Sequence, residues 1–334
     1  MKRKTSAVIV VLILMLAAAM LLDLSWAADP LSWSEVIDVL LGHGTWANDI
    51  IVKDINMPRI VAAVFVGAGL AVAGAVMQAV FRNPMASPYI LGLSSGASLG
   101  AAIGMLFVIP FIPSVVQVPV LAFIFCMATM LLVYSLSKIG GTVHVETLLL
   151  AGIAVNSLLS AMVSFLTLMS GDQLEGIVFW SLGSLASVSW DELCVIVPVV
   201  SVCIFALMFF TRALNAMMIG DSHALDLGID LRKTRLTVLV ITTVLTAISV
   251  AFVGAIGFVG LVIPHIFRLL LGPDNRLLLP FAAFGGATFL LLCDFISRTL
   301  ASVFGVLPIG IITALIGAPY FIYLVRRRRR DIGW

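Results

Sequence analysis

Residues 81–100, FRNPMASPYILGLSSGASLG, interrupt a chain that is almost wholly apolar on both sides of them. The stretch opens with Arg-Asn-Pro and Ser-Pro, and proline disfavours helical backbone in the residue before it. Four glycines, spaced four residues apart so that they share one helix face, follow at Gly92, Gly96, Gly100 and Gly104. We therefore predict a charged turn at a membrane surface, then a helix whose small residues let a neighbouring backbone approach closely.

The composition is that of a membrane protein. Of 334 residues, 62% are hydrophobic and only 11% are charged, and the mean hydropathy is +1.19. A soluble domain carries roughly a quarter charged residues. Repeated apolar runs of about 20 residues indicate helices that cross a bilayer, whereas a β-barrel would show short alternating segments. The predicted fold class is all-α, a polytopic membrane protein in which residues 1–334 form one transmembrane domain.

Ten transmembrane helices are predicted, and their order defines the connections between them. Two segments are polar enough to lie outside the membrane, 29–57 and 171–191, and the longest inner connection is 212–235. The predicted spans are 7–28, 58–81, 89–109, 117–137, 145–170, 192–211, 236–255, 256–271, 277–303 and 306–325.

The distribution of positive charge supports this layout. With the N-terminus inside, 16 of the 19 lysine and arginine residues fall on the inner side, as expected for cytoplasmic segments. The three exceptions are Lys53, Arg59 and Arg298. Treating 236–271 as one long helix would reverse the last spans and place five terminal arginines outside, so we predict a sharp turn at the glycine-rich segment 254–260. The C-terminus is then cytoplasmic.

The N-terminus fits two alternatives. Three basic residues precede an apolar run, and Ser-Trp-Ala at 25–27 resembles a signal-peptidase site. An uncleaved first span fits the same residues, and we favour it. The later topology is unaffected, because the next segment starts outside in both cases.

Few residues in the spans could carry chemistry. No Gly-Lys pair occurs, which excludes a Walker A loop, so the chain does not itself hydrolyse nucleotide. The histidines are scattered without metal-ligand spacing. Asp294 is the only acidic residue identified well inside a span, and Arg298 follows it at i+4, which permits a local ion pair. Pro264 and His265 lie in a short span that is a candidate broken helix.

The inner connection 212–235 reads as a compact two-helix element. Asp221 or Ser222 can cap a short helix, Gly228 suits its left-handed C-terminal position, and Asp230 can cap the next span. Such an element fits docking to a soluble partner, and an ordinary loop is an equal alternative. Outside, Arg59 and Arg298 end two spans, where they fit either recognition of an acidic partner or snorkelling to the interface.

Four stretches together resemble a known family. They are residues 57–100, 223–230 (HALDLGID), 254–280 (GAIGFVGLVIPHIFRLLLGPDNRLLLP) and 307–324 (LPIGIITALIGAPYFIYL). They are similar to the FecCD-type permease subunits of ATP-binding-cassette (ABC) importers for ferric siderophores, haem and cobalamin. The resemblance runs in order from about residue 50 to 326, and it implies the type II ABC importer permease fold.

The resemblance also implies partners and site residues. The chain is expected to pair with a second permease copy or paralogue, two cytoplasmic ATPase subunits that hold ATP and Mg²⁺, and an extracytoplasmic substrate-binding protein. It is expected to bind no cofactor, metal or nucleic acid itself. The ATPase-coupling residues implied are Gly220, Asp221, Ala224, Leu227 and Gly228. Arg59 and Arg298 fall at binding-protein docking positions, although some relatives carry a further arginine where this chain has Asn56.

The function that the resemblance implies is import of an iron chelate, a ferric siderophore, across a prokaryotic plasma membrane, through a permease that has no energy source of its own and is driven by the partner ATPases. The glycine face and the Pro264–His265 segment are candidates for helix packing or for the translocation path. Cobalamin or haem as cargo is the alternative. An ion-coupled carrier is disfavoured because buried carboxylates are scarce.

Overall fold

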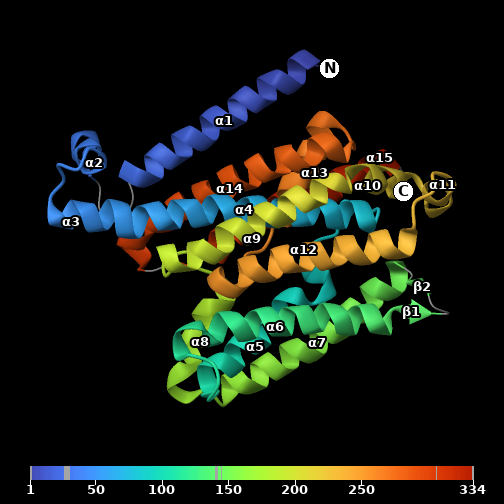
Figure 1. Cartoon of the computed structure of the whole chain (residues 1–334), viewed down its shortest axis with the longest axis horizontal. Helices are drawn as coiled ribbons and strands as arrows, with labels where there is room; N and C mark the ends of the chain where they lie inside the picture. Colours follow the sequence, from blue (N-terminus) through green and yellow to red (C-terminus); the bar gives the residue numbers. More distant parts are fainter. Residues whose placement is uncertain (1, 26–30, 140–141, 144, 306, 333–334) are drawn as a thin grey trace.

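The chain folds into a helical bundle with two packed groups of helices (Figure 1). The computed structural model describes residues 2–25, 31–139, 142–143, 145–305 and 307–332. Residues 26 and 27 of the candidate cleavage site lie outside this part of the chain. Each predicted span corresponds to one long helix: α1 (Lys2–Ser25), α4 (Met57–Val80), α5 (Leu93–Leu106), α6 (Ser114–Leu136), α7 (Val145–Leu168), α9 (Trp190–Phe209), α12 (Leu231–Val253), α13 (Val259–Leu271), α14 (Asn275–Phe304) and α15 (Ile309–Ile332).

Three of the spans are shorter than predicted. Seven helices in the described part of the chain are long and apolar enough to cross a membrane, while α5, α13 and the apolar part of α15 are shorter. At 1.5 Å per residue, the 13 residues of α13 rise only about 20 Å, against the roughly 30 Å of a hydrocarbon core. In α5 the difference arises because a 3₁₀ helix, η2 (Pro88–Leu91), takes up its predicted first turn.

Shorter elements mark the two ends of the bundle (Figure 1). One end, called the α2 end, carries α2 (Trp33–Leu40), α3 (Trp46–Asp49), the π-helix η1 (Ile50–Asn56), the 3₁₀ turn η3 (Gly171–Gln173) and α8 (Leu174–Leu182). The opposite α11 end carries α10 (Thr211–Ile219), α11 (Asp221–Asp226) and an antiparallel pair, β1 (Lys138–Ile139) with β2 (Thr142–Val143). These two-residue strands depart from the all-α expectation only in a turn.

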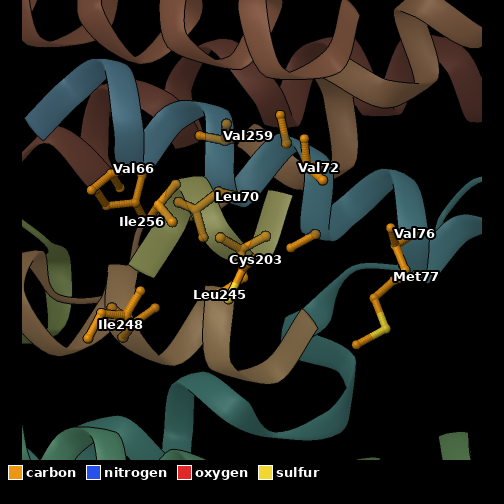
Figure 2. Packing of buried hydrophobic residues seen from close by; sticks show 14 of the residues in the cluster. Val66, Leu70, Val72, Val76, Met77, Cys203, Leu245, Ile248, Ile256 and Val259 are labelled. Carbon is orange, nitrogen blue, oxygen red and sulfur yellow. The ribbon is translucent and has the colours of Figure 1, made fainter. Parts of the chain in front are cut away.

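Helix α4 is the centre of the first group. It packs against α14, α13, α12 and α9, and every residue from Val66 to Val80 is buried. Figure 2 shows Val66 and Leu70 of α4 gathered with Cys203 of α9 and Leu245 of α12. The second group is α5, α6, α7 and α8, and α12 joins the two because it contacts both α4 and α6.

The predicted turn between α12 and α13 is present. Gly254 has φ +73° and Phe258 has φ +66°, so the chain leaves and re-enters helix through left-handed backbone. Irregular backbone at membrane depth requires its polar groups to be satisfied within the protein. The Tyr89 hydroxyl of η2 donates to the Ile256 carbonyl at 2.8 Å, which provides one such bond from a segment 167 positions away in the sequence.

Candidate functional site

The α10–α11 element has a small core of its own at the α11 end. Ala224 of α11 is fully buried against Met217 of α10, and Ile229 and Leu231 pack onto them. The segment that the sequence marks as a two-helix element is therefore folded as one. Its position is fixed from the inside by apolar contact and, as described next, by charged groups.

The capping of this element differs in one respect from the prediction. The N-cap residue of α11 is Gly220. Neither Asp221 nor Ser222 caps the helix with its side chain, although the sequence predicts that one of them does. Gly228 has φ +77° and Asp230 caps α12, both as predicted. The backbone N–H of Lys233 donates to the Asp230 carboxylate at 3.0 Å, which holds the pKa of Asp230 below its usual value.

Asp221 does not cap because its carboxylate binds two arginines. Arg235 Nη2 of α12 lies 3.2 Å from both carboxylate oxygens, and Arg82 Nη2, just beyond α4, contacts one of them. Each arginine is also held by a backbone carbonyl: Arg82 Nε donates to Met217 at 2.7 Å, and Arg235 Nη1 donates to Val143 at 2.9 Å. We call this group the Asp221 junction.

A second set of hydrogen bonds ties α10 to the start of α14. The Asn215 side-chain amide donates to Asp274 Oδ1 at 2.6 Å. Its carbonyl oxygen accepts the backbone N–H of Asn275 at 2.8 Å and the Asn275 side chain at 2.7 Å. Because Asn275 is fully buried, these bonds anchor α10 against the membrane bundle.

The outward surface of the same element is apolar. Leu225, Leu227 and Ile219 are more than half exposed, with Ile219 the most open at 72%. Exposed apolar side chains gathered at a helix turn are typical of an interaction surface. Of the five expected coupling residues, Leu227 therefore faces outward, whereas Ala224 and the Asp221 carboxylate face the protein.

The α2 end holds a second charged group, which includes both expected docking arginines. Arg59 at the start of α4 makes a bidentate pair with Asp294 of α14, with Nε–Oδ2 and Nη2–Oδ1 each 2.7 Å. Asp294 is fully buried, and the Arg59 side chain is 14% exposed. Two parallel N–H···O bonds are the preferred geometry for an arginine and a carboxylate.

The local Asp294–Arg298 ion pair predicted from i+4 spacing is replaced by more distant partners. Arg298 Nη1 lies 3.3 Å from Asp23 Oδ1 of α1, and its Nη2 donates to Asn56 Oδ1. Asp23 is fully buried, so Asp294 is not the only acidic residue inside a span. The sequence signal that could have found this site is Asp23 itself, which directly follows the apolar run of the first span and still lies in its helix. We call Arg59, Asp294, Arg298, Asp23 and Asn56 the Asp294 cluster.

A π-helix positions the cluster. The segment η1 leads directly into α4 and presents Asn56 to Arg298. The Asn56 amide also reaches the Leu24 carbonyl at 3.4 Å, and the Trp190 indole donates to the Lys53 carbonyl at 2.9 Å. The ends of α1, α4, α9 and α14 that lie at the α2 end are thus joined through polar groups.

The glycine face lies inside the protein. Gly96 and Gly100 are buried where α5 meets α6, and a Cβ at Gly100 would overlap the Leu121 carbonyl. Gly104 continues this contact. Gly92 is separate from the helix, with φ +76° at the junction of η2 and α5, against the α7 backbone. These residues set a helix–helix contact and present no surface of the isolated chain.

The remaining expected residues lie in α13, where Pro264 is buried and His265 is half-buried. One pattern escaped the sequence analysis: residues 92–96, GLSSG, match the GxSxG pattern of serine hydrolases. In those enzymes the pattern joins a strand to a helix. Here it joins η2 to α5, and the serine of the pattern, Ser94, lies in the first turn of α5 beside Ser95, whose hydroxyl contacts Asn156 of α7. The pattern is therefore part of a packed helix start.

Comparison with known proteins gives a consistent match over the whole bundle. Residues 13–327 match the model of the FecCD transport family. The chain is 43% identical to the cobalamin import system permease protein BtuC of Halobacterium salinarum, over 84% of this chain and 74% of the relative. It is 40% identical to the hemin transport system permease protein HmuU of Yersinia pestis, over 83% and 84%. It is 35% identical to the Fe(3+) dicitrate transport system permease protein FecD of Escherichia coli, over 97% and 99%.

A solved structure shares the fold. It describes an inward-facing conformation of an ABC transporter assigned to the metal-chelate type, and it superposes with a TM-score of 0.83 at 32% identity. The match covers 96% of this chain and 99% of that one.

Proposed function

This chain belongs to the FecCD transport family and is a multi-pass permease subunit of an ABC importer, and we propose that it carries an iron chelate, a ferric siderophore, into the cytoplasm. The observation that supports an iron chelate most directly is the nearly end-to-end match to a ferric dicitrate permease and to a metal-chelate type transporter. The chain is a transport subunit, so energy comes from partner ATPases that bind ATP and Mg²⁺.

Cobalamin or haem is the second candidate cargo. It is favoured by the higher identity to permeases named for cobalamin and hemin import. The test is ATP-dependent uptake in proteoliposomes holding this chain with its ATPase and binding protein, using equal concentrations of ferric siderophore, cobalamin and haemin. Preferential uptake of the ferric siderophore is expected. Preferential uptake of cobalamin or haemin assigns the chain to that cargo and rejects the siderophore.

The partner ATPases dock, in this proposal, on the apolar surface of the α10–α11 element. Ile219, Leu225 and Leu227 are exposed there. Gly220 precedes α11 in extended backbone, and Gly228 follows it with φ +77°. Leu227→Asp should abolish co-purification of the ATPase, because it places a charge in a contact that must desolvate. Wild-type capture of the ATPase by this variant would reject the docking surface.

The substrate-binding protein docks at the α2 end, and the second permease copy or paralogue completes the path. This orientation, with the C-terminus in the cytoplasm of a prokaryotic plasma membrane, is supported by the excess of basic residues toward the α11 end. A cysteine at an exposed position of α11 should react with a membrane-impermeant maleimide only in inside-out vesicles. Labelling in right-side-out vesicles would contradict this orientation and place the α11 end outside.

Docking through Arg59 and Arg298 requires carboxylates of the binding protein to compete with Asp294 and Asp23, since both arginines are already paired. Arg59→Glu and Arg298→Glu should weaken capture of the binding protein, with a larger effect at low salt. The matched variant Asp294→Asn breaks the same buried pair but keeps both arginines and frees Arg59, so capture per folded complex should stay at or above the wild-type level. Equal affinity in all variants would remove the arginines from docking.

A further inference from the structure

Helix α2 has three faces of different chemistry. Val36 and Val39 are buried against the protein. Glu35 and Asp38, also three residues apart, are exposed and form a polar face. The third face is apolar, and its side chains are between 48% and 66% exposed: Trp33, Ile37, Leu40 and Leu41. These positions follow one another at helical spacing, so they form one open stripe rather than scattered exposed residues.

The end of α1 fixes the level of α2 along the bundle. The backbone N–H of Leu31 donates to the carbonyl of Ser25, the last residue of α1, at 3.0 Å. Helix α2 contacts α1, and Figure 1 shows it just beyond the end of that helix. Because most of the apolar span of α1 is open to its surroundings, this end lies where hydrocarbon gives way to lipid headgroups. The apolar face of α2 is therefore at headgroup level, next to a lipid-facing helix.

Tryptophan side chains gather at the same level. Trp33 begins α2, Trp46 begins the adjoining α3 and is 80% exposed, and the half-exposed Trp190 begins α9 at the same end of the bundle. An indole combines a large apolar ring with one N–H donor, and tryptophan is accordingly enriched at the interface of membrane and water. The aromatic side chains thus favour a bilayer surface as the partner of this face.

The polar face of α2 carries negative charge. The Glu35 carboxylate accepts the Ser32 backbone N–H at 2.8 Å and the Ser32 hydroxyl, and these bonds hold the pKa of Glu35 below its usual value. Its charge complements the ammonium group of a zwitterionic phospholipid. A binding protein that offers carboxylates to Arg59 and Arg298 would instead be repelled by Glu35 and Asp38.

We propose that α2 lies in the outer headgroup layer of the bilayer. Its apolar face enters the boundary with the acyl chains by about 5–10 Å, the depth of interfacial helices. Glu35 and Asp38 face the ammonium groups of zwitterionic lipids. The helix thereby anchors the end of α1, and with it the surroundings of Asp23, at a fixed level in the membrane. Only the choice of leaflet rests on the proposed orientation of the chain.

Spin labels on the two exposed faces test this position. Cys194→Ser removes the exposed cysteine among the four, and the other three are buried. In this background, Ile37→Cys and Leu40→Cys place a label on the apolar face, and Ser34→Cys and Asp38→Cys are the matched controls. The complete complex is reconstituted in phosphatidylethanolamine-rich vesicles. Paramagnetic relaxation by oxygen, which concentrates in hydrocarbon, is then compared with relaxation by a water-soluble nickel chelate.

Labels at 37 and 40 should lie about 5–10 Å below the phosphates, whereas labels at 34 and 38 should lie in water. A measurement on the native side chain accompanies the labels. Lipids brominated in their acyl chains should quench the tryptophan fluorescence of the wild-type chain more strongly than that of Trp33→Phe.

The lipid headgroup provides the second arm. When phosphatidylethanolamine is replaced by phosphatidylglycerol, the label at 37 should move toward water, because the ammonium groups are lost and the phosphates repel the carboxylates. The double variant Glu35→Gln with Asp38→Asn should remove this shift. Equal depth in both lipids would reject the contact with ammonium groups.

Three results would overturn the membrane position. Equal access of the nickel chelate to labels at 37 and 38 would place α2 in water. Shielding of the label at 37 only after the binding protein is added would make this face a protein docking site. Shielding from oxygen and nickel alike before that addition would indicate a second permease copy. The orientation fails separately, through the maleimide labelling of α11, and the proposed function through the absence of ATP-dependent uptake.

Discussion

The Asp294 cluster and the Asp221 junction use the same chemistry, arginine on aspartate, at opposite ends of one bundle. In the cluster both aspartates are fully buried and the arginines are 14% and 7% exposed. In the junction the aspartate is 45% exposed and Arg82 is 37% exposed, while Arg235 is 10% exposed and keeps a second partner in the Val143 carbonyl. Buried pairs cannot lose one partner without leaving an uncompensated charge, whereas a half-exposed pair can re-form with water at little cost. The comparison indicates a fixed clamp at one end and a movable connection at the other.

The largest effect is expected from breaking the clamp at its most buried member. Asp294→Asn leaves the Arg59 guanidinium with no carboxylate, so the free energy of unfolding in detergent should fall by about 3–5 kcal/mol. Denaturant titration measures this change. A loss below about 1 kcal/mol would mean that Arg59 finds water or another partner, and that the pair is not a clamp.

A charge-free version of the same pair provides the control. Arg59→Met together with Asp294→Leu removes both charges and keeps apolar volume at the contact of α4 and α14. The double variant should be clearly more stable than Asp294→Asn, because replacing a buried pair by apolar groups is often neutral or stabilising. A double variant as unstable as the single one would show that packing volume, not charge, holds this contact.

A smaller effect is expected at Asp23, where Arg298 keeps a second partner in Asn56. Asp23→Asn should lower the free energy of unfolding by about 1–3 kcal/mol, the cost of one buried hydrogen-bonded group. The loss should be concentrated in α1, which contacts the bundle chiefly through α14. Faster hydrogen exchange confined to α1 would agree with this. Equal acceleration throughout the bundle would contradict it.

Asp221→Asn should be nearly silent in the same unfolding experiment. We expect a change of no more than about 1 kcal/mol, because the carboxylate is half exposed to water and the buried Arg235 keeps its bond to the Val143 carbonyl. A loss comparable to that of Asp294→Asn would remove the distinction between the two regions.

The smallest expected effect is the change of stability with salt, and it separates the two regions most clearly. Raising the ionic strength from about 0.1 to 1 M shortens the Debye length from about 10 to 3 Å. The stability difference between wild type and Asp221→Asn should shrink toward zero, while that for Asp294→Asn should persist because buried pairs are screened much less. Thermal unfolding of the three proteins at both salt concentrations tests this, and equal salt sensitivity would count against the burial argument.

The sequence predicts features that depend on neighbouring residues, and it does not predict contacts between residues that are far apart in the chain. The spans, the turn before α13 and the cap at Asp230 follow from local apolar runs, glycine and side-chain chemistry, and all are present. The partners of Asp294 and Asp221 could not be read locally. Arg59 is 235 positions from Asp294, and Arg82 is 139 positions from Asp221. From neighbouring residues alone, the sequence therefore predicted Arg298 as the partner of Asp294 and a helix cap as the role of Asp221.

The same limit explains the docking arginines. Their place at the ends of spans is visible in the sequence. Asp23, which pairs with Arg298, lies on α1, and the packing of α1 against α14 brings it there only in the folded chain. The role of Asn56 is likewise visible only in the structure. It occupies a position where some relatives are expected to carry arginine, and in this chain it is a hydrogen-bond partner of Arg298.

The central claim is that this chain is a passive gate moved through its α11 end. The most direct measurement is uptake of a ferric siderophore into vesicles containing the chain, with and without its ATPase and binding protein, after proton and sodium gradients have been collapsed. Accumulation only when both partners and ATP are present is the predicted result. Accumulation by the chain alone, driven by an imposed ion gradient, would contradict the account.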